Sequence, residues 1–335
     1  MKRGLIGIIL AGCSGAPGAP PLPTERTRTE GVVFTGAPGG ASVAACDRFG
    51  RWRAGGPTVE HWIELPDERK TVRPPEGSAK LSLFRQTVPL PQVTWGGSDV
   101  EVTQLLYPAG GGFVARYHVM NHGTDPRNVL LRVSAKGGKI ARADGQGSLA
   151  GETLTQQIRV EPGMSHFVSV TTPDLAGQVT PDLLDKAVEA WESRIGARKL
   201  SVPDEAAVTA YYADLAGAAL GVAGCAEAVE RLHARLARRE GDALRLFPDV
   251  PEEWVHGDVE IQGLPTPFGP LGLRSTGVFA TRSVELSGTC APPGGFLIAV
   301  PAGYKATVDG AAATVKEGLL RVPGNAKKVE MSRAP

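Results

Sequence analysis

The sequence predicts a mainly β protein in which two β-sandwich domains are joined by a short helical segment. Apolar residues alternate with polar ones in several short runs, which is the spacing of strands with one buried face. Glycine occurs 43 times and proline 27 times, often between those runs, where both residues favour turns. Between residues 176 and 240 the period changes to that of amphipathic helices.

The first residues have the features of an export signal. Basic residues at 2–3, a short apolar run at 5–10 and small residues at 11–12 precede Cys13. The apolar run is far shorter than the ~20 residues that span a bilayer. Residues 10–13 resemble the lipobox of bacterial lipoproteins, which implies a signal peptide over residues 1–12 and acyl chains, palmitate among them, on Cys13. The alternative is an ordinary secretory signal followed by a chance cysteine.

Residues 13–30 are expected to form the lipidated cysteine and a flexible tether, because small residues and proline cannot bury enough area to offset chain entropy. Acyl chains on Cys13 would hold the protein at a membrane, which places it in the bacterial cell envelope. Ser14, not Asp, follows Cys13, as in lipoproteins sent on to the outer membrane of hosts that have one. The net charge of +1 and the lack of a basic block argue against a nucleic-acid partner.

Residues 31–175 are expected to form the N-terminal β-sandwich. Phe113 to Val119 and Val129 to Ala135 place apolar side chains at every second position. A turn-rich connection over residues 121–127 separates these two runs. Similar alternation is present at residues 100–106, 153–160 and 166–171.

Residues 176–240 predict three helices. Thr180, Pro181 and Asp182 combine a hydroxyl N-cap, a proline in the first turn and an acid, and this helix continues to about Gly196. A second helix begins near Asp204 and is interrupted by glycines at 221 and 224. The third begins with Cys225 and places apolar residues on one face.

Residues 241–335 are expected to form the C-terminal β-sandwich. Short alternating runs occur at residues 296–300, 304–308, 319–322 and 327–331. The sequence Val-Asp-Gly-Ala at 308–311 predicts a tight hairpin.

Three cysteines remain after Cys13, so at most one disulfide can form among them. Cys225 is expected to be a small buried helix residue, whereas the sequence assigns no role to Cys46 or Cys290. No pair has the spacing of a metal site, and the six histidines lack a second ligand motif. We therefore expect neither a metal nor a cofactor.

Aromatic and acidic residues are the remaining candidates for chemistry. Aromatic rings suit sugars because their faces match the C–H surface of the sugar ring, although packing in a sandwich core explains most tryptophans. Trp95, between threonine and glycines, is the first candidate for glycan stacking; the others are Trp52, Trp62 and Trp254. The densest acidic cluster contains Glu252, Glu253 and His256, but adjacent residues on an extended chain point to opposite faces and do not make a hydrolytic pair.

Four segments resemble parts of a known family. "LRLFPDVPEEW" (244–254), "TPFGPL" (266–271) and the hairpin at 308–310 are similar to the chain that follows the catalytic barrel in six-hairpin (α/α)6-barrel glycosidase-like proteins. Residues 115–135 resemble a strand pair of the N-terminal sandwich that precedes such barrels. The resemblance implies the N- and C-terminal β-sandwich domains of this family. Only some 35 residues separate Tyr212 from Phe247, too few for about twelve helices, so no catalytic residue is carried over.

These observations predict a membrane-anchored lipoprotein that is non-catalytic and carbohydrate-associated, with a glycan as its ligand. The alternative is a structural lipoprotein that meets another envelope protein through its sandwich surfaces. A residual glycoside hydrolase is the third reading, and it needs two carboxyl groups facing each other across a cleft.

Overall fold

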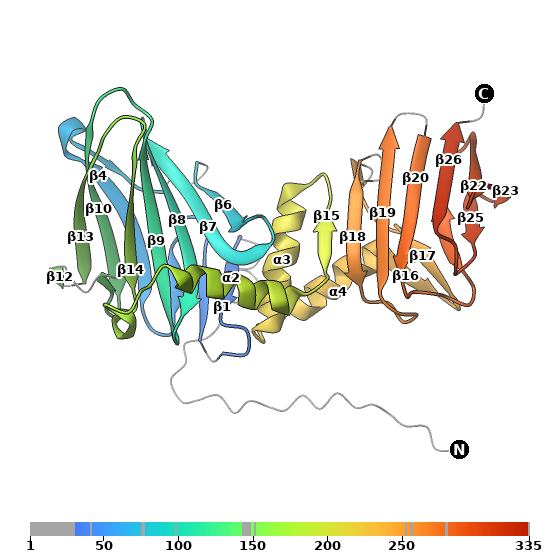
Figure 1. The fold of residues 1–335 in the computed structure, drawn as a ribbon, viewed down its shortest axis with the longest axis horizontal. Helices are drawn as coiled ribbons and strands as arrows, with labels where there is room; N and C mark the ends of the chain where they lie inside the picture. Colours follow the sequence, from blue (N-terminus) through green and yellow to red (C-terminus); the bar gives the residue numbers. More distant parts are fainter. Residues whose placement is uncertain are drawn as a thin grey trace, which may run out of the picture.

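The computed structural model describes residues 31–40, 42–74, 78–97, 99–142, 149–150, 152–251, 253–254, 257–278 and 281–333. The fold is mainly β, as predicted, with four sheets arranged as two sandwiches on either side of a helical segment (Figure 1). No helix in the described ranges is both long and apolar enough to cross a membrane.

The N-terminal sandwich is built from an eight-stranded sheet, called sheet A, and a six-stranded sheet, called sheet B. The order in sheet A is β1-β2-β3-β4-β10-β13-β12, with β5 paired to β4, and the order in sheet B is β11-β14-β9-β8-β7-β6. The strands of sheet A are β1 (Val33–Gly36), β2 (Val43–Cys46), β3 (Trp52–Ala54), β4 (Thr58–Leu65), β5 (Lys70–Val72), β10 (Arg127–Lys136), β12 (Leu149–Ala150) and β13 (Thr153–Val160). Those of sheet B are β6 (Lys80–Phe84), β7 (Val88–Gly97), β8 (Val100–Ala109), β9 (Gly112–Asn121), β11 (Ala141–Arg142) and β14 (Ser165–Thr171).

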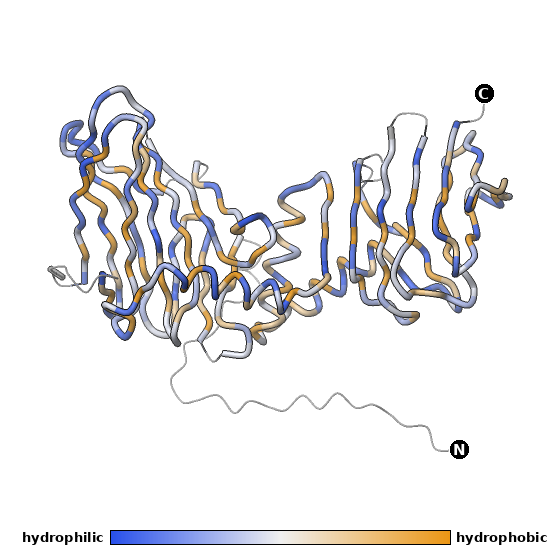
Figure 2. The backbone as a smooth tube through the Cα atoms, viewed as in Figure 1, coloured by the Kyte–Doolittle hydropathy of each residue, from blue (hydrophilic) through white to orange (hydrophobic). Residues whose placement is uncertain are grey.

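The alternation in the sequence explains how these two sheets pack. Odd-numbered residues of β9, from Phe113 to Val119, and of β10, from Val129 to Ala135, are buried in one core between the sheets. The hydropathy colouring alternates along these strands in the same way (Figure 2). Burial of one face at every second residue fixes the register, because a slip by one residue would expose the whole apolar set.

Three α-helices follow: α2 (Asp182–Ile195), α3 (Glu205–Ala219) and α4 (Cys225–Leu236). The Asp204 side chain caps α3 by accepting hydrogen bonds from the backbone N–H groups of Ala206 and Ala207. The expected hydroxyl cap of α2 is wrong, since the Thr180 hydroxyl bonds to the Asp182 carboxylate and not to a helix N–H group. Short 3₁₀ helices lie at Pro66–Glu68 and Pro173–Leu175.

The C-terminal sandwich contains a seven-stranded sheet and a five-stranded sheet. The larger sheet has the order β15-β18-β19-β20-β26-β22-β23 and the smaller β16-β17-β21-β25-β24. Their strands are β15 (Lys199–Ser201), β16 (Ala237–Glu240), β17 (Ala243–Leu246), β18 (Val259–Leu264), β19 (Leu271–Val278), β20 (Thr281–Gly288), β21 (Phe296–Ala299), β22 (Tyr304–Val308), β23 (Ala311–Ala313), β24 (Val315–Lys316), β25 (Leu319–Val322) and β26 (Lys328–Arg333). Strands β15 and β16 lie within residues 176–240 but join the C-terminal sheets.

The helices link the two sandwiches. Helix α3 lies between β6, an edge strand of sheet B, and β15, an edge strand of the larger C-terminal sheet (Figure 1). Helix α2 packs on the outer face of sheet B, where Ala187, Val188 and Trp191 meet apolar side chains of β7, β8 and β9. No disulfide links Cys46, Cys225 and Cys290, all of which are buried.

A buried polar group lies inside the N-terminal sandwich. The His61 ring on β4 stacks on Trp95 of β7, with 4.3 Å between ring centroids, and its edge faces Tyr117 of β9. Neither nitrogen of His61 has a hydrogen-bond partner among the described residues. The side-chain oxygen and nitrogen of Gln104 are also buried without a partner there. Burial lowers the pKa of His61 to about 3, so this histidine is neutral at physiological pH.

The low pKa of His61 predicts acid sensitivity. In the unfolded chain the His61 ring takes up a proton near pH 6.5, whereas in the folded chain it does so only near pH 3. Above pH 6.5 the ring is neutral in both states and does not reduce the free energy of unfolding. As the pH falls through this window, His61 should lower the free energy of unfolding by about 1.4 kcal/mol per pH unit. Denaturant unfolding at several pH values would give the change of the free energy of unfolding with pH. This slope should be smaller by that amount in His61→Phe. The exposed His166→Ala variant should keep the wild-type slope, and an unchanged slope in His61→Phe would contradict the assignment.

Candidate functional site

Three of the four tryptophans proposed for glycan stacking are buried. Trp52, Trp95 and Trp254 are exposed by 1%, 2% and 3%, and each belongs to a hydrophobic core. The interpretation of Trp95 as an exposed ring is therefore wrong. Its position on β7 has the same parity as Val93, which points into the core, so the flanking glycines do not turn the ring outward.

Trp62 is the only one of the four with a partly accessible ring. It lies on the outer face of sheet A, where Arg73 covers it with 4.6 Å between the guanidinium carbon and the ring centroid. Its indole N–H donates to Glu64, and Glu64 in turn accepts from Arg132 at 3.0 Å. Most polar groups around Trp62 thus pair with one another, and the Nε of Arg132 is the donor left without a partner among the described residues.

The acidic cluster does not form a described site. Glu252 and His256 lie outside the described residues, and Glu253 is exposed. Trp254, beside them, packs into the core of the C-terminal sandwich.

The outer face of sheet B carries a row of side chains that crosses five strands. Phe167 of β14 pairs with His118 of β9, His118 with Thr103 of β8, Thr103 with Thr94 of β7, and Thr94 with Lys80 of β6. Directly paired residues project from the same face of an antiparallel sheet. Neighbouring strands are ~4.8 Å apart, so the row is about 19 Å long.

A second row lies beside the first, and the two rows together are called the platform. Its members are paired in the same way: Ser169, Arg116, Leu105, Gln92 and Ser82. Leu105 is buried beneath α2, together with Val88, Leu90 and Tyr107. Helix α2 therefore covers one half of the outer face of sheet B, Leu105 included, and the other platform residues lie on the half that it leaves open (Figure 1).

Phe167 is the aromatic centre of the platform. It is 51% exposed, and the His118 ring stacks on it at 4.5 Å between centroids with 18° between the planes. The Arg116 guanidinium lies 4.1 Å from the Phe167 ring centroid. Burial lowers the pKa of His118, Arg116 lowers it further and Glu101 opposes the change, so the surroundings favour the neutral form of His118.

Hydroxyl and amide groups occupy the rest of the platform. The Thr94 and Thr103 hydroxyls lie 3.1 Å apart, and the Ser82 hydroxyl donates to the carbonyl of Gln92 at 3.4 Å. The Gln92 side-chain amide has no hydrogen-bond partner within the described part of the chain. In contrast to the outer face of sheet A, this surface keeps donors and acceptors available to a ligand.

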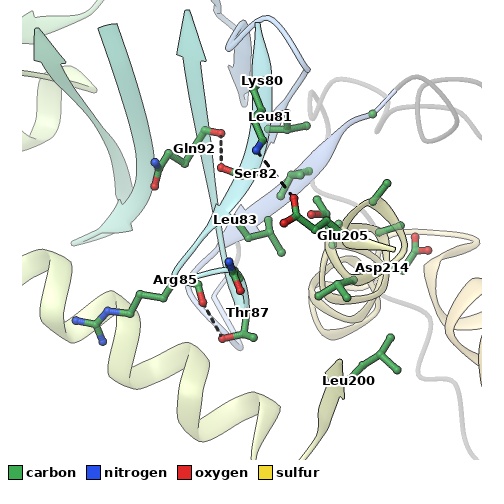
Figure 3. Close-up of a pocket in the computed structure, with 18 of the residues that line it drawn as sticks. Lys80, Leu81, Ser82, Leu83, Arg85, Thr87, Gln92, Leu200, Glu205 and Asp214 are labelled. Atoms are coloured by element: carbon green, nitrogen blue, oxygen red, sulfur yellow. Dashed lines mark hydrogen bonds and ion pairs between the residues drawn. The ribbon is translucent and has the colours of Figure 1, made fainter. Parts of the chain in front are cut away.

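The platform continues into a groove between β6 and α3 (Figure 3). The groove has a volume of about 1260 Å³ and shares Lys80, Ser82, Gln92 and Thr94 with the platform. Lys80 reaches across its mouth toward Glu205 at 4.0 Å, and both side chains are so exposed that this ion pair contributes little stability. No aromatic side chain of the described residues lines the groove.

Two carboxyl groups line this groove, but their spacing does not fit glycoside hydrolysis. Glu205 and Asp214 are both on α3, nine residues apart. At 1.5 Å and 100° per residue, the two positions are ~13 Å apart along the axis and on opposite sides of the helix. Glycosidases need their two carboxyl groups ~5–10 Å apart across the sugar. Within the described residues, no group of three His, Cys, Asp or Glu side chains is placed to hold a metal.

The platform residues could have been located from the sequence. The alternation in β9 that buries Tyr117 and Val119 also places Arg116 and His118 on the opposite face. What the sequence does not reveal is which part of that outer face α2 covers, because the position of a helix on a sheet depends on tertiary packing.

Comparisons with known proteins give little further information. No protein-family model and no curated protein matches this chain. A solved polysaccharide lyase aligns with 86% of this chain and 40% of its own length, at 10% sequence identity and a TM-score of 0.21. The chain thus spans about two fifths of that lyase, and a TM-score this low does not establish a common fold.

The burial of Trp95 predicts a structural role. Trp95→Ala should lower the free energy of unfolding by about 3–5 kcal/mol, because it removes a large ring from a packed core and leaves His61 without its stacking partner. Chemical denaturation would measure the loss, with the half-buried Trp62→Ala as the milder comparison. A Trp95→Ala protein as stable as the wild type would contradict the structure at this position.

Proposed function

We propose that this chain is a lipid-anchored protein of the bacterial cell envelope that binds a glycan on the platform without cleaving it. The observation that carries this proposal is the open row across five strands, with an exposed aromatic ring at one end and hydroxyl groups along its length. The glycan would lie across the strands, from Phe167 toward the groove beside β6.

The chemistry of the platform suits a sugar chain. The Phe167 ring is 51% exposed even with the His118 ring stacked on it and the Arg116 guanidinium over it, so it still offers apolar surface to the C–H groups of one sugar. The amide of Gln92 and the hydroxyls of Thr94 and Thr103 then offer donors and acceptors for sugar hydroxyls. A few placed polar groups beside an apolar surface are typical of small-molecule sites.

The resemblance to six-hairpin glycosidase-like proteins fits a binding role. We infer that this chain retains the two sandwiches of that family and lacks its catalytic barrel. Three helices lie between the described sandwiches, α2, α3 and α4, where a barrel needs about twelve. The anchor on Cys13 and the tether up to residue 30 would hold the platform near the envelope surface.

A protein partner is the second candidate. Met164 and Phe167 are 61% and 51% exposed, and they are the exposed large apolar side chains of the described residues. Met164 precedes β14 and Phe167 lies within it, so a partner from the envelope could dock there. Two side chains are a small area against the several hundred Å² of a typical docking patch, which favours the glycan.

Removal of the Phe167 ring should weaken glycan binding. Affinity electrophoresis of residues 24–335 in gels that contain neutral or acidic polysaccharides would identify a retarding polymer. Phe167→Ala should then bind it about two- to tenfold more weakly, because ring contacts contribute ~0.5–1.5 kcal/mol.

Phe268→Ala is the matched control, since Arg239 lies over that ring in the C-terminal sandwich. Equal weakening by both variants, or no retardation of the wild type by any polymer, would argue against the platform. Sugar released from the polymer would overturn the non-catalytic role.

Cys13 should determine where the protein is found. In cells fed labelled palmitate, the wild type should carry the label and sediment with membranes, whereas Cys13→Ser should be unlabelled and leave the membrane fraction. Cys46→Ser is the control and should keep both properties, because Cys46 is buried in the sandwich core. Label retained by Cys13→Ser would contradict the lipoprotein assignment.

A further inference from the structure

A second, smaller pocket lies at the ends of α2 and α3, away from the platform. It has a volume of about 270 Å³ and is lined by seven residues: Trp191, Arg194, Ile195, Arg198, Leu215, Ala218 and Ala219. The two alanines leave room where larger side chains would fill the space between the helices. No acidic side chain lines the pocket among the described residues.

The backbone brings two arginines to this pocket. Helix α2 ends at Ile195 because Gly196 adopts a φ of 63°, which favours glycine. The N–H of Arg198 then donates to the carbonyl of Ile195 at 3.4 Å and turns the chain back. Arg194 in the last turn of α2 and Arg198 after it therefore reach the same pocket.

The hydrogen-bond donors at this pocket are not used within the described chain. Neither guanidinium group has an ion pair or a hydrogen bond to a described residue. Trp191 is fully buried, and its indole N–H has no hydrogen-bond partner there either. Both arginines are exposed, and guanidinium groups bind carboxylate and phosphate oxygens through parallel N–H bonds.

We infer that this pocket binds an oxyanion group of phosphate size, held by the guanidinium groups of Arg194 and Arg198, with Trp191 in its wall. The carbonyl ends of two helices lie nearby and disfavour an anion. The paired positive charge of the two arginines offsets this effect. This pocket shares no residue with the platform, so the anion proposal does not depend on glycan binding.

A competing explanation is that the arginines only balance the negative ends of α2 and α3. That role would affect helix stability but would give no response to phosphate. Trp191 distinguishes the two, because it lines the pocket and its indole signal reports an anion that binds beside it.

The test is a titration of the full-length chain with inorganic phosphate at constant ionic strength, followed by the indole ¹H–¹⁵N signals. Trp191→Phe assigns the signal. The Trp191 signal should move and saturate, while the other indole signals stay in place. Arg194→Ala and Arg198→Ala should each weaken the response roughly tenfold or more.

Arg231→Ala is the matched control, since Arg231 is an exposed arginine on α4 outside the pocket. It should bind phosphate as the wild type does. An unmoved Trp191 signal would overturn the proposal. So would arginine variants that lose stability but keep the wild-type response, because that result assigns them to the helix ends alone.

Discussion

The position of α2 on sheet B is the constraint on which the surface of this protein depends. A sheet in a sandwich buries one face against its partner, and the other face must be either covered or polar. Ala187, Val188 and Trp191 cover the apolar half of the outer face of sheet B, over Leu90 and Leu105. The remaining half is polar and open, and this division creates the platform.

The alternation of side chains between the two faces of a strand explains which features the sequence predicts well. The alternation in β9 and β10 predicts two buried faces, and the structure confirms them. The same rule places Trp95 in the core, because Val93 and Trp95 share a face of β7. The glycines beside Trp95 suggested an exposed ring. Glycines next to a residue do not reverse the alternation of side chains along a strand, so Trp95 stays on the buried face.

Tertiary packing determines the features that the sequence does not reveal. The platform needs five strands in one register, and that register joins residues as distant in sequence as Lys80 and Phe167. The pocket at Arg194 and Arg198 needs two helix ends brought together by the turn at Gly196. Residues that are far apart in the sequence meet in both places, so a pattern within one segment cannot predict them.

The proposed function requires a glycan to lie across the open half of sheet B. Amide hydrogen exchange of the protein, measured with and without the retarding polysaccharide, would locate the bound glycan. A bound glycan should add protection to the parts of β14, β9, β8 and β7 around Phe167, His118, Thr103 and Thr94, and none to sheet A. Protection confined to the C-terminal sandwich, or to the face around Trp62, would contradict it.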